Sequence, residues 1–419
     1  MVAHGEPQVA PATPGDAEPG ALAMNPFVDI HIHPPPRAYP IDVAQIATIT
    51  VRCPVRGRGL VIRDLTRADE PALFAFFADL VSHGGELAFD SDAPLVPALA
   101  EIGFLVRDAD IVDWPRFRVA LPEPPADAPV PDARWTVSRS VVQQPAFALH
   151  PGVRWPVDYE EQDGRLDCFA GGPALWIGDP AAMVAAYWLT DDQARTLAAL
   201  VPGAPVPPLP PPLARALAAA GAVVPPDRAE PSPFARLADA RAAFAAQDHA
   251  IVRDLVGPGE LAALRRYYAA LLAAGLLPFG DRQVQARYSA YNDPVGRFVH
   301  ARLARTMSLL AGRAVIPSFS YFFSYVPGAR LAPHKDRPQA EFSISLQLDH
   351  TPEPAGPTGW PLQFSFDDGR QIAADLAIGD AVLYHGRAVT HHRDVLPDGQ
   401  RSSVLVLEYV PHDFAGLVM

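Results

Sequence analysis

The stretch SFSYFFSYVPGARLAPHKD, residues 318–336, decides the fold of the C-terminal half of this 419-residue chain. Aromatic side chains stand at every second position near its start, which is typical of a strand with one buried face. A Pro-Gly pair then marks a turn. Beyond the turn, His334 and Asp336 are two residues apart, so an extended backbone places both side chains on the same side. The stretch therefore predicts a strand, a turn and a second strand edge that carries two potential metal ligands.

Short apolar segments separated by turn residues continue to the end of the chain. Strands are predicted at residues 318–325, 341–348, 362–366, 381–385 and 403–410. Upstream of them, a short strand at 250–255 and two amphipathic helices at 258–274 and 295–311 are expected. This pattern predicts an α+β fold whose C-terminal domain is a jelly roll, or double-stranded β-helix.

Proline-dense stretches indicate where the chain divides. The stretches at residues 122–131 and 225–233 are poor interiors for helices or strands and are interpreted as domain boundaries. The first 25 residues are small, polar and rich in proline, which predicts a disordered tail, and Met24 is an alternative start. The predicted division is a tail at 1–25, two small α+β modules at 26–121 and 122–228, and the jelly-roll domain at 229–419.

The two predicted modules share a weak internal repeat. Each shows short strands, a Leu-Thr pair before a helix, a second helix, and then glycine with a short apolar strand. Thr66 and Thr190 are expected to be the N-caps of the first helices. This order resembles a winged-helix module and, loosely, the leader-peptide recognition domains of peptide-modifying enzymes. Two small packing domains without a binding role are the alternative interpretation.

The composition excludes several classes of protein. A net charge of −13 argues against a general nucleic-acid binder, which normally presents a basic face. The two cysteines, Cys53 and Cys168, are far apart and form neither a zinc motif nor a disulfide framework. No apolar run is long enough for a membrane span, and no signal peptide is recognised. A cytoplasmic protein that acts on a peptide or a small molecule is expected.

The residues around His334 indicate a metal site. Two imidazoles and one carboxylate hold Fe(II) on one face and leave other positions open. His334 and Asp336 supply one imidazole and the carboxylate, and His385, His391 and His392 are the candidates for the second imidazole. An arginine downstream of them, Arg401, offers a planar fork for a carboxylate. Together these residues predict an iron enzyme with a small dicarboxylic acid as co-substrate.

A family resemblance rests on motifs that occur in order along the C-terminal part. They are YVPGARLAPHKD at 325–336, GDAVLYHGR at 379–387, HHR at 391–393 and RSS at 401–403. From about residue 245 onward the chain resembles the Fe(II)/2-oxoglutarate-dependent dioxygenases of the prolyl-hydroxylase-like group. The family pattern selects His391 as the third ligand. The resemblance implies Fe(II) as cofactor with 2-oxoglutarate and O2 as co-substrates, and the carboxylate at Asp336 argues against a halogenase.

The same resemblance assigns residues to the co-substrate. It implies that Arg401 holds the distal carboxylate of 2-oxoglutarate, with Ser403 on the same strand face. Tyr325 and Gln347 match positions that donate hydrogen bonds to 2-oxoglutarate, and Arg393 is the rival anchor. The expected contacts with the substrate itself are Arg287, Tyr288, Tyr291 and Arg393, where the first three lie in a segment that is equally well a plain connection.

The expected reaction is hydroxylation of an unactivated C–H bond. The first hypothesis is that the N-terminal half presents a peptide or protein, of which one amino-acid side chain is hydroxylated. The second is hydroxylation of a free amino acid or small metabolite, with the N-terminal half as a lid or as the surface of a homodimer. The third, from another class, is a non-catalytic binding or sensing protein with a relic barrel, which the intact ligand positions oppose. Neither nucleic acid nor a membrane is expected as a partner.

Overall fold

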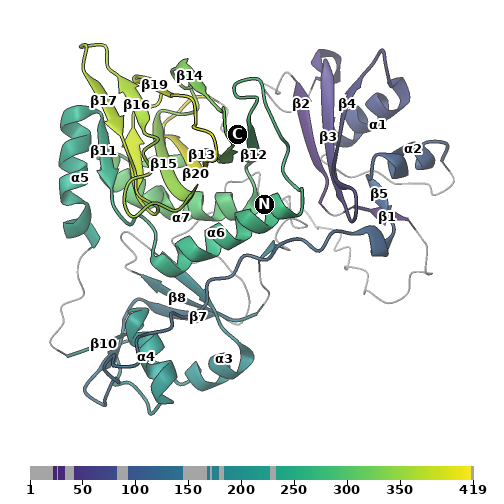
Figure 1. The fold of residues 1–419 in the computed structure, drawn as a ribbon. Helices are drawn as coiled ribbons and strands as arrows, with labels where there is room; N and C mark the ends of the chain where they lie inside the picture. Colours follow the sequence, from purple (N-terminus) through teal and green to yellow (C-terminus); the bar gives the residue numbers. More distant parts are fainter. Residues whose placement is uncertain are drawn as a thin grey trace, which may run out of the picture. The chain divides into compact units, whose positions relative to one another are not determined.

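The computed structural model describes residues 22–25, 27–33, 42–82, 93–144, 168–169, 172–178, 184–226 and 233–416. The chain forms two compact units, Met1–Asp113 and Trp114–Met419. The second unit therefore contains both the second predicted module and the barrel (Figure 1). The finer boundaries at residues 122 and 229 remain predictions.

The first unit is built on a three-stranded antiparallel sheet with two helices. Its elements are β1 (Ala23–Met24), β2 (Asp29–His33), η1 (Val43–Gln45), β3 (Thr48–Val55), β4 (Gly59–Thr66), α1 (Pro71–Ser82), α2 (Val96–Glu101), β5 (Leu105–Val106) and η2 (Asp108–Asp110). The sheet order is β2-β3-β4, and β1 pairs with β5. Side chains of β3 and β4 pack with those of α1 and α2 in one hydrophobic cluster that includes Ile49, Leu65 and Phe77.

The segment that follows has the same order of elements. It consists of β6 (Thr136–Val137), β7 (Val141–Gln144), β8 (Ala174–Gly178), β9 (Val184–Trp188), α3 (Asp191–Leu197), α4 (Pro211–Ala219) and β10 (Val223–Val224). The sheet order is β7-β8-β9, and β6 pairs with β10 as β1 pairs with β5. Thr190 caps α3 with a complete capping box, as predicted. Thr66 instead accepts a hydrogen bond from the backbone of Asp69 in a turn before α1, so its prediction as a helix cap is wrong.

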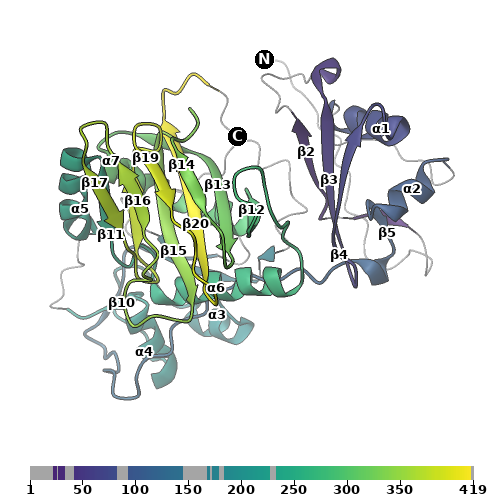
Figure 2. The same ribbon diagram turned by 45° about the horizontal axis from the view of Figure 1, so that its top comes forward.

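The barrel consists of two antiparallel sheets. Its strands are β11 (His249–Val252), β12 (Arg287–Tyr291), β13 (Val315–Tyr325), β14 (Leu331–His334), β15 (Phe342–Thr351), β16 (Leu362–Ser365), β17 (Gln371–Ala374), β18 (Ala381–Tyr384), β19 (Thr390–Arg393) and β20 (Arg401–Pro411). One sheet has the order β11-β18-β15-β20-β13-β12 and the other β14-β19-β16-β17 (Figure 2). Most successive strands from β13 to β20 change sheet, which gives the jelly-roll connection pattern. Aromatic and aliphatic side chains, among them Phe323, Phe364 and Val404, fill the space between the sheets.

Three helices lie against the outside of the larger sheet. They are α5 (Pro233–Gln247), α6 (Pro258–Ala273) and α7 (Pro294–Ala311). Helix α7 begins at Asp293, whose carboxylate accepts hydrogen bonds from the backbone of Val295 and Gly296, and ends at Gly312 in the left-handed conformation. It packs on β13 and β20, while α6 packs on β15. This helical layer fixes which face of β20 points away from the barrel interior.

An aromatic cluster joins the second module to this helical layer. The Phe298 ring of α7 lies 5.5 to 6.2 Å from four aromatic rings, three of them in the module and one in the segment that leads into it. These residues are Phe117, Phe169, Trp176 and Trp188. All four are buried, as is Phe298. Helix α7 is therefore covered on one side by the barrel sheet and on another by the module.

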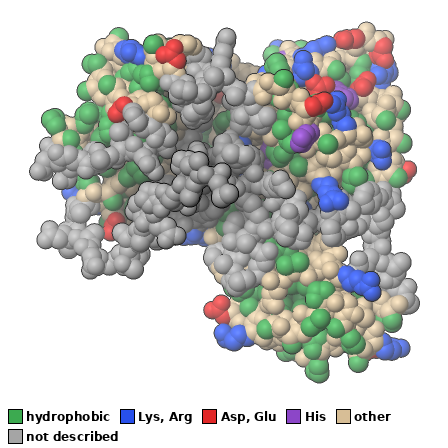
Figure 3. All heavy atoms as spheres, turned by 180° about the vertical axis from the view of Figure 1, so that it is seen from behind, with side chains coloured by type: hydrophobic (Ala, Val, Ile, Leu, Met, Phe, Trp, Pro, Cys, Tyr) green, Lys and Arg blue, Asp and Glu red, His purple; other side chains and the backbone are tan. Residues whose placement is uncertain are grey.

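The exposed surface carries charges of both signs. Lys and Arg side chains are interspersed with Asp and Glu side chains and with hydrophobic ones on the coloured part of the face drawn in Figure 3. In the described part of the chain, no helix combines the length and the hydropathy that crossing a bilayer requires.

Candidate metal centre

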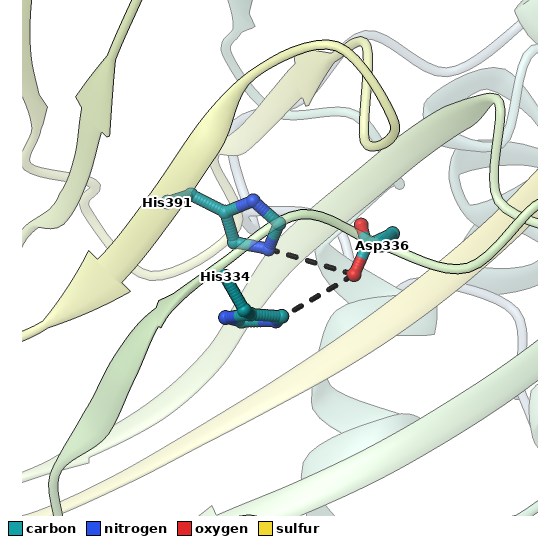
Figure 4. Close-up of side chains that lie close together, drawn as sticks. All are labelled: His334, Asp336 and His391. Carbon is teal, nitrogen blue, oxygen red and sulfur yellow. Dashed lines mark ion pairs between the residues drawn. The ribbon is translucent and has the colours of Figure 1, made fainter.

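Three side chains from the smaller sheet and the loop beside it converge on one point (Figure 4). His334 on β14 and His391 on β19 are direct partners in the antiparallel register, so their side chains lie next to each other. Asp336 follows two residues after His334, just beyond the end of β14. Its Oδ1 lies 3.6 Å from the Nε2 of each histidine, and one ligand atom from each residue falls within 4.8 Å of the others. The sequence-predicted trio is therefore assembled in space.

Backbone carbonyls fix the tautomers of both histidines. The Nδ1 of His334 lies 2.9 Å from the carbonyl oxygen of Ala332, and the Nδ1 of His391 lies 3.1 Å from that of Val389. A carbonyl can only accept, so each Nδ1 carries a proton and each Nε2 of the neutral ring has a free lone pair. This is the arrangement by which proteins orient metal-binding histidines. The donor set, two neutral imidazole nitrogens and one carboxylate oxygen, fits Fe(II).

Burial shifts the pKa values in the directions that suit these roles. Burial lowers the pKa of His391 to about 4, and it lowers that of His334, with the neighbouring imidazole as the second cause. Both rings are thus uncharged at neutral pH and need not lose a proton to bind a cation. Burial raises the pKa of Asp336 to about 6, which a dication beside the carboxylate would lower.

Asp336 is held by close packing around its carboxylate. Its backbone N–H donates to the carbonyl of Gly386, 2.9 Å away, and its Oδ2 lies 3.3 Å from the hydroxyl of Ser343. A Cβ atom on Gly386 would overlap this Oδ2, the Ser343 hydroxyl and the carbonyl of Ala340. Residue 386 must be glycine for the carboxylate to occupy this position.

A buried arginine lies on the same strand face as His391. Arg393 is two residues further along β19, and only 3% of it is exposed, as for His391. Its Nη1 donates to the carbonyl of Trp360 at 2.6 Å, and its guanidinium carbon lies 4.6 Å from the centre of the Trp360 ring. Burial lowers its pKa. Among the described residues no carboxylate forms an ion pair with Arg393, so a buried positive charge lacks a counter-charge.

Arg401 lies on a different strand face from the metal centre, and its expected role toward 2-oxoglutarate remains a prediction. Arg401 is exposed at the start of β20 and lies opposite Thr351 of β15. Ser403, expected to share its face, donates to the hydroxyl of Ser324 and is paired with Asp349, which is bonded to Arg265 of α6. This face therefore points to the helical layer, whereas Val404 belongs to the barrel interior. Neither Arg401 nor Ser403 faces the interior where His391 and Arg393 lie.

Tyr325 and Gln347 both lie inside the barrel. The hydroxyl of Tyr325 accepts a hydrogen bond from Arg287 and keeps its own proton for another acceptor. The side-chain nitrogen of Gln347 lies within hydrogen-bond distance of Ser402 and of two backbone carbonyls at an irregularity in the β15–β20 pairing. These contacts explain Gln347 as a support of the strand pair, and its role toward 2-oxoglutarate remains a prediction.

The expected substrate contacts other than Arg393 lie on β12, which the sequence pattern had placed in a loop. Arg287 is buried and donates to Asp281, Gln283 and Tyr325, which accounts for its guanidinium without a substrate. Tyr288 packs on the ring of Phe279 at 4.7 Å. Tyr291 lies 4.7 Å from the ring of Tyr321, and burial raises its pKa to about 12. Their roles as substrate contacts remain predictions.

Sequence reasoning missed two residues that adjoin the site. Glu408 is 3% exposed on the interior face of β20, and Ser343 lies directly opposite it on β15. The signal was present: Glu408 is a lone acidic residue in the otherwise apolar run VLVLEYV, residues 404–410. A carboxylate in such a run is buried only where it has a partner.

Searches among known proteins found similarity in structure alone. No protein-family model and no curated protein matches the chain. A prolyl-4-hydroxylase from Pseudomonas putida is 18% identical with a TM-score of 0.35, over 42% of this chain and 99% of that one. An oxidoreductase of the 2OG-Fe(II) oxygenase family from Burkholderia pseudomallei is 16% identical with a TM-score of 0.35, over 43% and 92%.

A third solved structure is a prolyl hydroxylase from Trichoplax adhaerens in complex with a peptide fragment of hypoxia inducible factor. It is 10% identical with a TM-score of 0.35, over 44% of this chain and 94% of that one. The solved structures that this chain resembles are thus 2-oxoglutarate-dependent oxygenases, prolyl hydroxylases among them.

Proposed function

We propose that this chain is an Fe(II)- and 2-oxoglutarate-dependent dioxygenase that hydroxylates an unactivated C–H bond. The observation that carries the proposal is the convergence of the two Nε2 atoms and the Asp336 carboxylate within 4.8 Å. His334, Asp336 and His391 would hold the ferrous ion. Ferrous iron with 2-oxoglutarate supplies the oxidant for such a bond, and one atom of O2 enters the substrate while the other enters succinate, with release of CO2.

Arg393 takes the place of Arg401 in this proposal. A buried guanidinium without a counter-charge binds a carboxylate more strongly than an exposed one, because solvent does not screen the pair. Arg393 shares a strand face with His391, so an anion bound to it lies on the metal side of the sheet. The Tyr325 hydroxyl is inside the barrel and can donate a second hydrogen bond. Both residues would orient the keto acid, and Trp360 covers the guanidinium.

Anaerobic titration with Fe(II) and 2-oxoglutarate tests this assignment. The complex is expected to show the visible charge-transfer band of the chelated metal, and His334→Ala should abolish it. Arg393→Gln should weaken 2-oxoglutarate binding at least tenfold while Fe(II) still binds, whereas Arg401→Gln is the matched control and should change neither. An unchanged affinity in Arg393→Gln, or a loss confined to Arg401→Gln, would contradict the anchor. No band in the unsubstituted protein would contradict the reaction class.

For the substrate, we propose an amino-acid side chain in a peptide or protein. The support is the N-terminal unit, which has a sheet and a core of its own and belongs to the same chain as the barrel with the metal centre. Binding of peptides encoded near the gene should be measured with the full chain and with residues 1–113. Fe(II)-dependent succinate formation that is stimulated by a bound peptide is the expected result. Stimulation by free amino acids or metabolites, without peptide binding, would favour the small-molecule alternative.

A further inference from the structure

The carboxylate of Asp336 is backed by a chain of hydrogen bonds that crosses the larger sheet. The Ser343 hydroxyl lies 3.3 Å from Asp336 Oδ2 and 2.6 Å from Glu408 Oε2. Ser343 and Glu408 are direct partners in the β15–β20 register, so their inward side chains are neighbours by construction of the sheet. Asp336 Oδ2 is therefore occupied from behind, while Oδ1 is the oxygen that faces both histidines.

Glu408, the second carboxyl group in this series of hydrogen bonds, has no cationic side chain as a partner in the described part of the chain. Glu408 is buried, and among the described residues no Lys or Arg forms an ion pair with it. The nearest basic influence is Arg337, whose guanidinium is stacked on Phe319 at 3.8 Å. Burial raises the pKa of Glu408 well above its ordinary value, with the charge of Asp336 as the second cause. A carboxylic acid is thus the form that this place favours.

The number of available protons decides how the hydrogen bonds between Asp336, Ser343 and Glu408 can form. A hydroxyl has one proton and donates once, so Ser343 cannot donate to two carboxylates. If Glu408 is the acid, its O–H donates to the Ser343 oxygen and the Ser343 O–H donates to Asp336 Oδ2. The Ser343 oxygen and Asp336 Oδ2 then each have a partner, and the charge remains on the metal-side carboxylate. The backbone of Glu408 is also fixed, since its carbonyl accepts from His300 Nε2 of α7 at 2.7 Å.

We infer that Glu408 is a positioning residue which, through the Ser343 hydroxyl, holds Asp336 in the orientation that binds the metal. The inference rests on the proposed metal site and adds a residue from the opposite sheet to it. A hydrogen-bond donor at position 408 is sufficient for this role, and a negative charge is not required. Partners of this kind typically change metal affinity 10- to 100-fold when they are removed.

Metal affinity in the absence of 2-oxoglutarate and substrate is the appropriate measurement. Fe(II), or Co(II) as an air-stable probe, should be titrated anaerobically into the full chain at neutral pH. Glu408→Leu and Ser343→Ala should each weaken binding about 10- to 100-fold. Glu408→Gln should remain within about threefold of the unsubstituted protein, because the amide N–H donates to Ser343 as the acid does. The double variant Ser343→Ala/Glu408→Leu should be no weaker than either single variant.

Ser345→Ala is the matched control, since Ser345 is the next buried serine on the same face of β15. It should leave metal affinity unchanged. Thermal unfolding of each variant separates a local effect from a loss of fold, and if Glu408→Leu does not fold, Ser343→Ala and Glu408→Gln decide. Unchanged affinity in Ser343→Ala, or an equal loss in Glu408→Gln and Glu408→Leu, would overturn the inference. If the unsubstituted protein binds no metal, it is the proposed function that fails.

Discussion

The two α+β modules have the same order of strands and helices but differ in what covers their sheets. In the first, the residues of the core cluster come from the module itself, and Phe77 packs against Phe104 at 5.1 Å. In the second, three buried aromatic side chains, together with Phe117 just before the module, pack on Phe298 of α7, which also supports the barrel. Sharing an order of elements therefore does not mean sharing a role. The first module has the organisation of a separable unit, and the second belongs to the unit that holds the candidate metal centre.

Of the predicted effects, Phe298→Ala should show the largest difference in stability between the two modules. Removing a buried phenylalanine ring costs about 3 to 5 kcal/mol, and here the lost contacts hold module and barrel together. Unfolding of Trp114–Met419 can be followed by tryptophan fluorescence, because all six tryptophans lie in this unit. The matched variant Phe77→Ala should destabilise the first unit by a similar amount and leave the fluorescence transition and metal binding in place. One common transition for both variants would show that the modules do not differ.

Lowering the pH should destabilise the second unit through His300, by a smaller free energy than Phe298→Ala does. Burial lowers the pKa of His300 on α7 to about 3, below its ordinary value of 6.5. Between these values the unfolded chain binds a proton that the folded one does not, so stability is lost as the pH falls from 6.5. Between pH 6.5 and 5, the free energy of unfolding should fall by about 2 kcal/mol less in His300→Gln than in the unsubstituted protein.

The measurement is denaturant unfolding followed by tryptophan fluorescence at each pH, and the quantity is the difference between His300→Gln and the unsubstituted protein. His391 titrates in the same direction and cancels in this difference. The first unit contains neither His300 nor a tryptophan, so its transition, followed by circular dichroism, serves as the control. Equal slopes with and without His300 would contradict the prediction.

The helix starts of the two modules provide the finest test. Thr190 caps α3 through a reciprocal pair of bonds with Gln193, whereas Thr66 stabilises a turn before α1. Thr190→Ala should cost about 1 kcal/mol, as the loss of an N-cap usually does. Thr66→Ala should cost less than about 0.5 kcal/mol, since no helix start depends on it. Thermal unfolding by circular dichroism measures both, and a larger loss in Thr66→Ala would contradict the assignment.

Strands with regular alternation were predictable from the sequence, and polar or short strands were not. The strands β13, β15, β16, β18 and β20 lie close to their predicted ranges because each is a short alternating or apolar run bounded by turn residues. Strand β19 has the sequence THHR, and its polarity reflects the ligands that it carries. The β12 strand looked like a polar loop, and α5 is an alanine-rich helix that follows a proline-dense boundary. In each of these elements, the polar side chains or the alanine content hide the apolar periodicity by which a strand or helix is recognised.

The metal ligands were predictable and the arginine was not. His334 and Asp336 share one local backbone, so their spacing carries the geometry, and the family pattern selected His391 from three nearby histidines. Whether Arg401 points inward depends on the register of β20, where a shift of one residue exchanges the two faces. Both faces of β20 are apolar, as Val404 and Leu405 are both buried, so its pattern does not say which side is the interior. The buried state of Arg393 appears only when the sheets are packed together.

The absent side chain at Gly386 limits how this centre could be redesigned. Exchanging Asp336 for glutamate adds a methylene group beside a glycine whose missing Cβ leaves the room that the carboxylate and the Ser343 hydroxyl occupy. A longer ligand must therefore displace the neighbouring turn before it can reach an ion. Any attempt to give the barrel a different metal preference has to start from a residue that binds no metal at all.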